Sequence, residues 1–161
     1  MRKGKAIKVT VNGTLHESVV ASNMTLLDYL REELGLTGAK KGCDNGQCGS
    51  CTVLMNGKAI YACLTLAVQA DQCHITTIEG LSEEGSLHPL QKSFIEEGAV
   101  QCGFCTPGMI LSAKALLDEN RKPTDGDIKE ALSGNLCRCT GYVNIIKAVR
   151  KVSCGGDTVD G

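Results

Sequence analysis

The stretch Gly42-Cys43-Asp44-Asn45-Gly46-Gln47-Cys48-Gly49-Ser50-Cys51 places three cysteines in one short glycine-rich loop. Cys63 follows after eleven more residues, so this first set reads C-x4-C-x2-C-x11-C. Four thiolates that converge suit a soft metal centre. The glycines let the main chain approach such a centre closely, and they let successive N–H groups point inward at a negatively charged group. This stretch therefore predicts a metal site held by one loop and one later cysteine.

The spacing of the first set is that of plant-type [2Fe–2S] ferredoxins, although plant ferredoxins have a longer gap before the fourth cysteine. A zinc knuckle and a group of redox thiols are the alternatives. Zinc sites favour a C-x2-C pair at both ends, which this set lacks. We therefore expect Cys43, Cys48, Cys51 and Cys63 to bind a [2Fe–2S] cluster.

A second set of cysteines reads C-x2-C-x31-C-x-C and consists of Cys102, Cys105, Cys137 and Cys139. This spacing alone is less diagnostic, because structural zinc could use it. We expect these sulfurs at helix N-termini, where the helix dipole favours negative charge. Together with the first set, this favours a second iron–sulfur centre. Cys73 and Cys154 belong to neither set, and their roles stay open.

Composition excludes several classes of protein. The chain has 161 residues, a formal net charge of −1, five Tyr and Phe residues together, and no Trp. It lacks the basic patch and the aromatic residues that nucleic-acid binding requires. It has no apolar run near the ~20 residues of a membrane span, and no signal-peptide pattern. We therefore expect a cytoplasmic protein whose cysteines stay reduced, which makes metal binding more plausible than disulfides.

The pattern of apolar residues predicts an α+β chain with two domains, residues 1–79 and 80–161. The first domain is expected to contain a hairpin over 6–20, a helix over 25–34 capped by Ser22 or Asn23, a hairpin over 52–62, and a strand near 74–78. A polar linker is expected over 79–86. Helices are expected over 87–97, 107–120, 124–133 and 142–152, with Pro107 as a first residue and Thr124 as a cap. A short mobile tail should begin at Ser153.

Three motifs together resemble the small iron–sulfur subunit of molybdenum hydroxylases. They are the 42–51 stretch, Gln101-Cys102-Gly103-Phe104-Cys105-Thr106-Pro107-Gly108-Met109, and Gly134-Asn135-Leu136-Cys137-Arg138-Cys139-Thr140-Gly141-Tyr142. The family includes xanthine dehydrogenase, aldehyde oxidoreductase, carbon monoxide dehydrogenase, nicotinate dehydrogenase and 4-hydroxybenzoyl-CoA reductase. The resemblance extends from about Ile7 to Val152.

The resemblance implies a plant-ferredoxin-like (β-grasp) domain followed by a four-helix bundle, each with one [2Fe–2S] cluster. It implies a large molybdopterin-binding partner and a medium FAD-binding partner, assembled as a dimer of heterotrimers. Electrons would pass from molybdenum through the two clusters to FAD. In this family the residues at Cys139 and Gln101 contact the pterin, so these two would bind cofactor at the point where electrons arrive. No substrate site or catalytic residue is expected on this chain, and the substrate stays open.

Two other classes of protein compete with this interpretation. A zinc-binding interaction module would be colourless and free of iron. A free-standing ferredoxin would be isolated alone, with no tight partner. Metal content and co-purification distinguish the three hypotheses.

Overall fold

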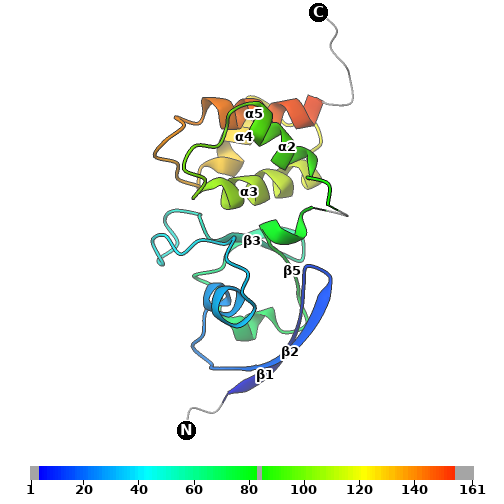
Figure 1. Ribbon diagram of the computed structural model, residues 1–161, viewed down its shortest axis with the longest axis vertical. Coiled ribbons are helices and arrows are strands. Elements are labelled where there is room, and N and C mark those ends of the chain that lie inside the picture. The colour runs from blue at the N-terminus through cyan, green and yellow to red at the C-terminus, as the bar shows by residue number, and fades with distance from the viewer. Residues whose placement is uncertain (1–3, 83–84, 155–161) are drawn as a thin grey trace, which may run out of the picture.

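The computed structural model describes residues 4–82 and 85–154, and of Cys154 only the main chain. We call residues 4–82 the sheet half and residues 85–154 the helical half; the two halves stack end to end (Figure 1). In these two ranges, no helix has the length and apolar character needed to cross a membrane.

The sheet half is built on a five-stranded mixed sheet with the order β2-β1-β5-β3-β4. The strands are β1 Lys5–Val11, β2 Thr14–Val20, β3 Thr52–Met55, β4 Lys58–Tyr61 and β5 His74–Thr76. Only the β1–β5 pair is parallel. Both predicted hairpins are confirmed, and both turn at an Asn-Gly pair in which each residue has a positive φ, the conformation of a type I′ turn.

The predicted helix over 25–34 is only partly correct. A three-residue helix, α1 Leu26–Asp28, leads into a π-helix, η1 Tyr29–Glu33. The cap is Thr25 rather than Ser22 or Asn23, because the Thr25 hydroxyl accepts a hydrogen bond from Asp28 N at 3.0 Å. The wider turn accompanies burial of four large side chains against the sheet: Leu26, Leu27, Tyr29 and Leu30.

Two short 3-10 helices complete the sheet half, η2 Ala67–Ala70 and η3 Ile78–Gly80. The second of them overlaps the start of the predicted linker. Its Glu79 carboxylate accepts hydrogen bonds from Gly38 N and from the Thr77 hydroxyl, whereas Leu81 beyond it is buried in the core of the helical half. The beginning of the predicted linker is therefore tied to the sheet half.

The helical half contains four α-helices: α2 Pro89–Glu96, α3 Thr106–Glu119, α4 Asp125–Leu132 and α5 Val143–Cys154. Each predicted helix in this half is present. Thr124 caps α4 as expected, by accepting a hydrogen bond from Asp127 N. Pro107 is the second residue of α3, not the first. Ser153 lies inside α5 rather than in the predicted tail, and the rest of that tail, 155–161, lies outside the described residues.

Each half has its own hydrophobic core. In the sheet half, alternate residues of β1 (Ile7, Val9 and Val11) point into the core, as a strand buried on one face requires. The core of the helical half includes Leu54 of β3 and Leu81. Helix α3 is the layer that faces the sheet half (Figure 1), and it packs on β3.

Candidate metal centres

The first set of cysteines lies in the loop between η1 and β3, with Cys63 just after β4. Three main-chain N–H groups, from Asn45, Gln47 and Cys48, point at Cys43 Sγ over 3.5, 3.2 and 3.3 Å. The loop can turn its N–H groups inward because Gly46 has a φ of +78°. The sequence thus builds the anion-binding nest that its glycines predict.

The thiols of the first set influence one another in two neighbouring pairs. The pKa of Cys43 responds to the thiol of Cys48, and the pKa of Cys51 responds to the thiol of Cys63. The main-chain N–H of Asn45 is the largest of several effects that lower the pKa of Cys43 to about 7. Burial raises the pKa of Cys51 to about 12. A buried thiolate of this kind is stable only beside positive charge, which a bound metal would supply.

The second set also forms two pairs. Cys139 Sγ lies 3.7 Å from Cys102 Sγ, and the pKa of Cys105 responds to the neighbouring thiol of Cys137. Burial, followed by the neighbouring Cys137, raises the pKa of Cys105 to about 12. Burial is the largest single effect on the pKa of Cys137 and acts to raise it, but hydrogen bonding from the hydroxyl and N–H of Thr140, together with smaller effects of Cys139 and Cys105, lowers that pKa.

The expectation that the second sulfurs sit at helix N-termini holds only for Cys105, which is the N-cap of α3. Cys102 lies before this helix, and Cys137 and Cys139 lie in the loop before α5. The helix dipole therefore acts most directly on Cys105.

The donor chemistry fits a [2Fe–2S] cluster in each set, because such a cluster takes four cysteine thiolates, two for each iron. Two sulfur pairs in each set match this requirement. Among residues 4–82 and 85–154, no group of three or more His, Cys, Asp or Glu side chains is spaced to hold one metal ion. The cysteine side chains that the structure describes form no disulfide.

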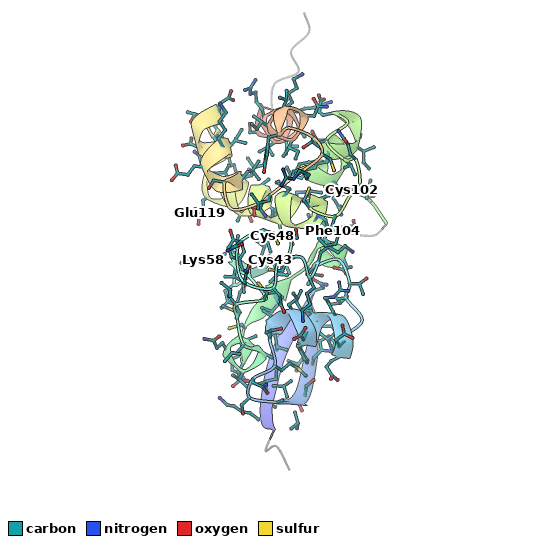
Figure 2. The ribbon with its side chains drawn as sticks, turned by 90° about the vertical axis from the view of Figure 1, so that its left-hand side faces the viewer. Cys43, Cys48, Lys58, Cys102, Phe104 and Glu119 are labelled. Atoms are coloured by element: carbon teal, nitrogen blue, oxygen red, sulfur yellow. The ribbon has the colours of Figure 1, made fainter. Side chains whose placement is uncertain are left out.

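The main chain also leaves room for the first centre. A Cβ added at Gly42 would lie 2.8 Å from Cys48 Sγ and 3.4 Å from Phe104 Cε1. Any larger residue would therefore press on the Cys48 sulfur. Phe104 comes from the helical half, between Cys102 and Cys105, and its ring covers this part of the first loop. Figure 2 shows Cys43 and Cys48 where the two halves meet, with Phe104 beside them.

Three consecutive residues at the start of the 134–142 motif form hydrogen bonds with the sheet half. The carbonyl of Gly134 accepts a hydrogen bond from the Tyr61 hydroxyl over 3.0 Å. The side chain of Asn135 donates to Gly49 O over 3.0 Å. The main-chain N–H of Leu136 donates to Cys48 O over 2.9 Å. We call these three residues the 134–136 clamp.

The clamp depends on close contact between main chains. A Cβ added at Gly49, whose φ is +68°, would lie 2.4 Å from Gly134 O. A Cβ added at Gly108 of α3 would lie 2.4 Å from Gly49 O. Glycine at these positions lets the first cysteine loop approach both α3 and the second cysteine loop.

Within each predicted set, the structure places the cysteines next to one another in pairs. Gln101 and Cys139 are both exposed on the helical half, next to Cys102 in sequence or in space. Sequence reasoning gave no role to Asn135, Tyr61 or Thr52, which join the two groups. Asn135 does lie within the motif that matches the family, which was the one signal that could have pointed to it.

Comparison with known proteins gives two family matches along the chain. Residues 9–84 match the family described as "2Fe-2S iron-sulfur cluster binding domain". Residues 77–150 match the family described as "[2Fe-2S] binding domain". The first cysteine set falls in the first match, and the second set falls in the second.

Two curated relatives match most of the chain. The nicotinate dehydrogenase small FeS subunit of Eubacterium barkeri is 56% identical over 144 residues, covering 89% of this chain and 92% of the relative. The nicotine 6-hydroxylase small subunit of Paenarthrobacter nicotinovorans is 52% identical over 143 residues, covering 89% of this chain and 86% of the relative.

Solved structures agree with these matches. A chain of quinoline 2-oxidoreductase from Pseudomonas putida 86 superposes with a TM-score of 0.90 and 49% identity, covering 94% of this chain and 93% of that one. Aldehyde oxidoreductase from Desulfovibrio gigas superposes with a TM-score of 0.91 and 44% identity. It covers 96% of this chain but only 18% of that longer one. The sheet half is thus a ferredoxin-like [2Fe–2S] domain, and the chain belongs to the family of small iron–sulfur subunits of molybdenum hydroxylases.

Proposed function

We propose that this chain is the electron-transfer subunit of a molybdenum hydroxylase complex. It relays electrons between a molybdopterin site and FAD, each on a partner subunit, through two [2Fe–2S] clusters. The clusters supply one-electron redox chemistry when bound, and the chain supplies their ligands and their relative placement. Cys43, Cys48, Cys51 and Cys63 hold one cluster, and Cys102, Cys105, Cys137 and Cys139 hold the other.

One observation supports this proposal above the rest: the two cysteine groups are joined directly. The Leu136 N–H, next to Cys137, donates to the carbonyl of Cys48. If the clusters served only to stabilise the fold, the loops that hold them would not need to contact each other. A chain that passes electrons from one cluster to the other does need this contact.

Exposure supports one direction for the relay. Cys102 and Cys139 are exposed at the surface of the helical half, and Gln101 is exposed beside them. Cys51 and Cys63 are buried in the sheet half. We infer that the molybdopterin of the large partner docks near Gln101 and Cys139 and delivers electrons there. The medium FAD-binding partner would then take them from the first set.

The remaining features of the proposal follow from the family. The four helices act as a four-helix bundle domain, with a division near residues 79 and 80. The complex is a dimer of heterotrimers in the cytoplasm. Nothing in this role involves nucleic acid or a membrane.

The test uses the isolated complex with Cys139→Ser in this chain. We expect turnover with the physiological acceptor to be lost, since the sulfur nearest the arriving electrons is changed. Cys73→Ser is the matched control, because Cys73 lies outside both groups and its thiol points at the carbonyls of Gln69 and Asp71. Full activity and an intact cluster spectrum in Cys139→Ser would show that the assigned role of Cys139 is wrong.

A further inference from the structure

Asn135 is a polar residue at the junction with only 3% of its surface exposed. Its side-chain NH2 group donates to Gly49 O over 3.0 Å and to Thr52 Oγ1 over 3.2 Å. Its side-chain oxygen accepts a hydrogen bond from Ser112 Oγ over 2.8 Å. Both donors and the acceptor of the amide are thus used, and the bonds lead to three different parts of the chain.

These three bonds connect the parts that hold the two clusters. Gly49 lies between Cys48 and Cys51 of the first set. Asn135 itself lies two residues before Cys137 of the second set. Ser112 belongs to α3, the helix whose N-cap is Cys105. A single buried amide therefore contacts the first cysteine loop, the second cysteine loop and the helix between them.

These hydrogen bonds favour a single arrangement, because the site is buried and its polar groups all have hydrogen-bond partners. Gly49 O accepts three hydrogen bonds, from Thr52 N, Thr52 Oγ1 and Asn135 Nδ2. No buried side-chain nitrogen or oxygen among the described residues lacks a partner. A buried network in which every group is paired fixes one arrangement of its members. Loss of one member leaves its partners without a hydrogen bond in a site that is shielded from water.

We propose that Asn135 is a positioning residue that sets the distance and orientation between the two clusters and tunes the potential of the first one. The inference rests on the proposed electron relay. Electron transfer between two centres slows steeply as their separation grows, so a loosened junction slows the relay. Hydrogen bonding around a cluster sets its potential. Without the Asn135 amide, the Gly49 carbonyl loses a hydrogen bond that offsets its negative partial charge. The carbonyl then disfavours the extra electron of the reduced first cluster, which lowers the potential of that cluster.

The test compares the whole complex with Asn135→Ala, Ser112→Ala or Asn144→Ala in this chain. Asn144 is the matched control, because its NH2 group also donates to a glycine carbonyl, Gly98 O at 3.4 Å, but inside the helical half alone. The readouts are iron content, the midpoint potential of each cluster, and the magnetic splitting between the two reduced clusters in electron paramagnetic resonance.

For Asn135→Ala we expect full iron content, a lower potential for the first cluster, a smaller magnetic splitting and a severalfold loss in the rate of electron transfer between the clusters. Ser112→Ala removes only the bond that orients the amide, so it should shift each readout in the same direction but less. It also serves as the milder variant if Asn135→Ala loads poorly. Asn144→Ala should match the wild type.

Wild-type potentials and splitting in an iron-loaded Asn135→Ala complex would overturn the inference, even if its stability fell, since a purely structural residue would behave in that way. Failure of the proposed function looks different. Substrate would then leave both clusters oxidised in the wild-type complex, while chemical reduction would still reveal any effect of Asn135 on potential and splitting.

Discussion

Leu136 and Cys48 are joined by a main-chain hydrogen bond of 2.9 Å, from the N–H of the first to the carbonyl oxygen of the second. Cys48 belongs to the first cysteine set, and Leu136 precedes Cys137 of the second. Leu136 is 55% exposed, so the main chain rather than the side chain makes this connection. The two sets are therefore separated by a few covalent bonds and one hydrogen bond.

Leu136→Pro should damage the junction, because proline has no N–H to donate to Cys48 O. The unpaired carbonyl and the altered main chain should lower stability by about 1–3 kcal/mol. Leu136→Ala keeps the N–H and should be close to the wild type. Thermal unfolding measures the loss of stability. Stopped-flow reduction of the first cluster by substrate measures whether damage to the junction slows electron transfer. Equal behaviour of the Pro and Ala variants would show that the hydrogen bond has no role.

Gly49→Ala should destabilise the chain far more than Gly13→Ala. Both glycines have a positive φ, +68° and +81°, so each alanine carries a main-chain cost of roughly 1–2 kcal/mol. At Gly13 a Cβ would meet nothing within 4 Å, whereas at Gly49 it would lie 2.4 Å from Gly134 O. Overpacking should add about 1–3 kcal/mol at Gly49. Denaturant unfolding of the two iron-loaded variants compares their free energies of unfolding. Similar losses of free energy in Gly49→Ala and Gly13→Ala would argue against close packing at the junction.

The contrast between these glycines shows what the sequence could and could not predict. The Asn12-Gly13 turn is local chemistry, and it correctly predicted the first hairpin. The need for glycine at Gly49 comes from Gly134, which is far away in the sequence, so no local pattern revealed it. The same holds for the cap of α1. Ser22 and Asn23 are good capping residues, but Leu26 and Leu27 donate their N–H groups to Thr65 O and Ala62 O, which fixes the helix start at Thr25.

Phe104→Ala should raise the midpoint potential of the first cluster. Phe104 is 46% exposed, and its ring lies against Gly42, where an added Cβ would lie 3.4 Å from Phe104 Cε1 and 2.8 Å from Cys48 Sγ. Without it, water reaches the Cys48 sulfur and stabilises the extra negative charge of the reduced state. We expect a shift of roughly 20–60 mV, since ~59 mV is a tenfold change for a one-electron couple. Potentiometric titration with optical detection measures it.

Ile95→Ala is the control for this variant, because Ile95 is an exposed apolar residue, 63% accessible, on α2. Its potentials should equal those of the wild type. A shift of the second cluster alone in Phe104→Ala would contradict the placement of this ring over the first set.

Cys105→Ala should remove the second centre while the first survives, because it deletes one of four thiolate ligands. Iron content should fall from about four to about two atoms per chain. Cys73→Ala should keep about four, since its sulfur belongs to neither set. Iron analysis by mass spectrometry measures this, with sulfide analysis beside it. Loss of both centres in Cys105→Ala would mean that the two sites load as one unit.

The cysteine sets themselves were the most predictable part of the site, because ligand spacing is written directly in the sequence. Their division into sulfur pairs was not predictable. Cys102 pairs with Cys139, and Cys105 with Cys137, across 37 and 32 residues of chain, and only the packing of the helical half sets which sulfurs meet. The role of Asn135 was not predictable for a similar reason, since its partners in the sheet half lie more than 80 residues away in the sequence.

In the proposed relay, this chain holds two separate diiron clusters at one junction. Electron paramagnetic resonance of the dithionite-reduced native complex, with metal analysis of the same sample, tests it most directly. We expect about four irons per chain and two distinguishable [2Fe–2S] signals. A silent spectrum, or zinc in place of iron, would contradict it.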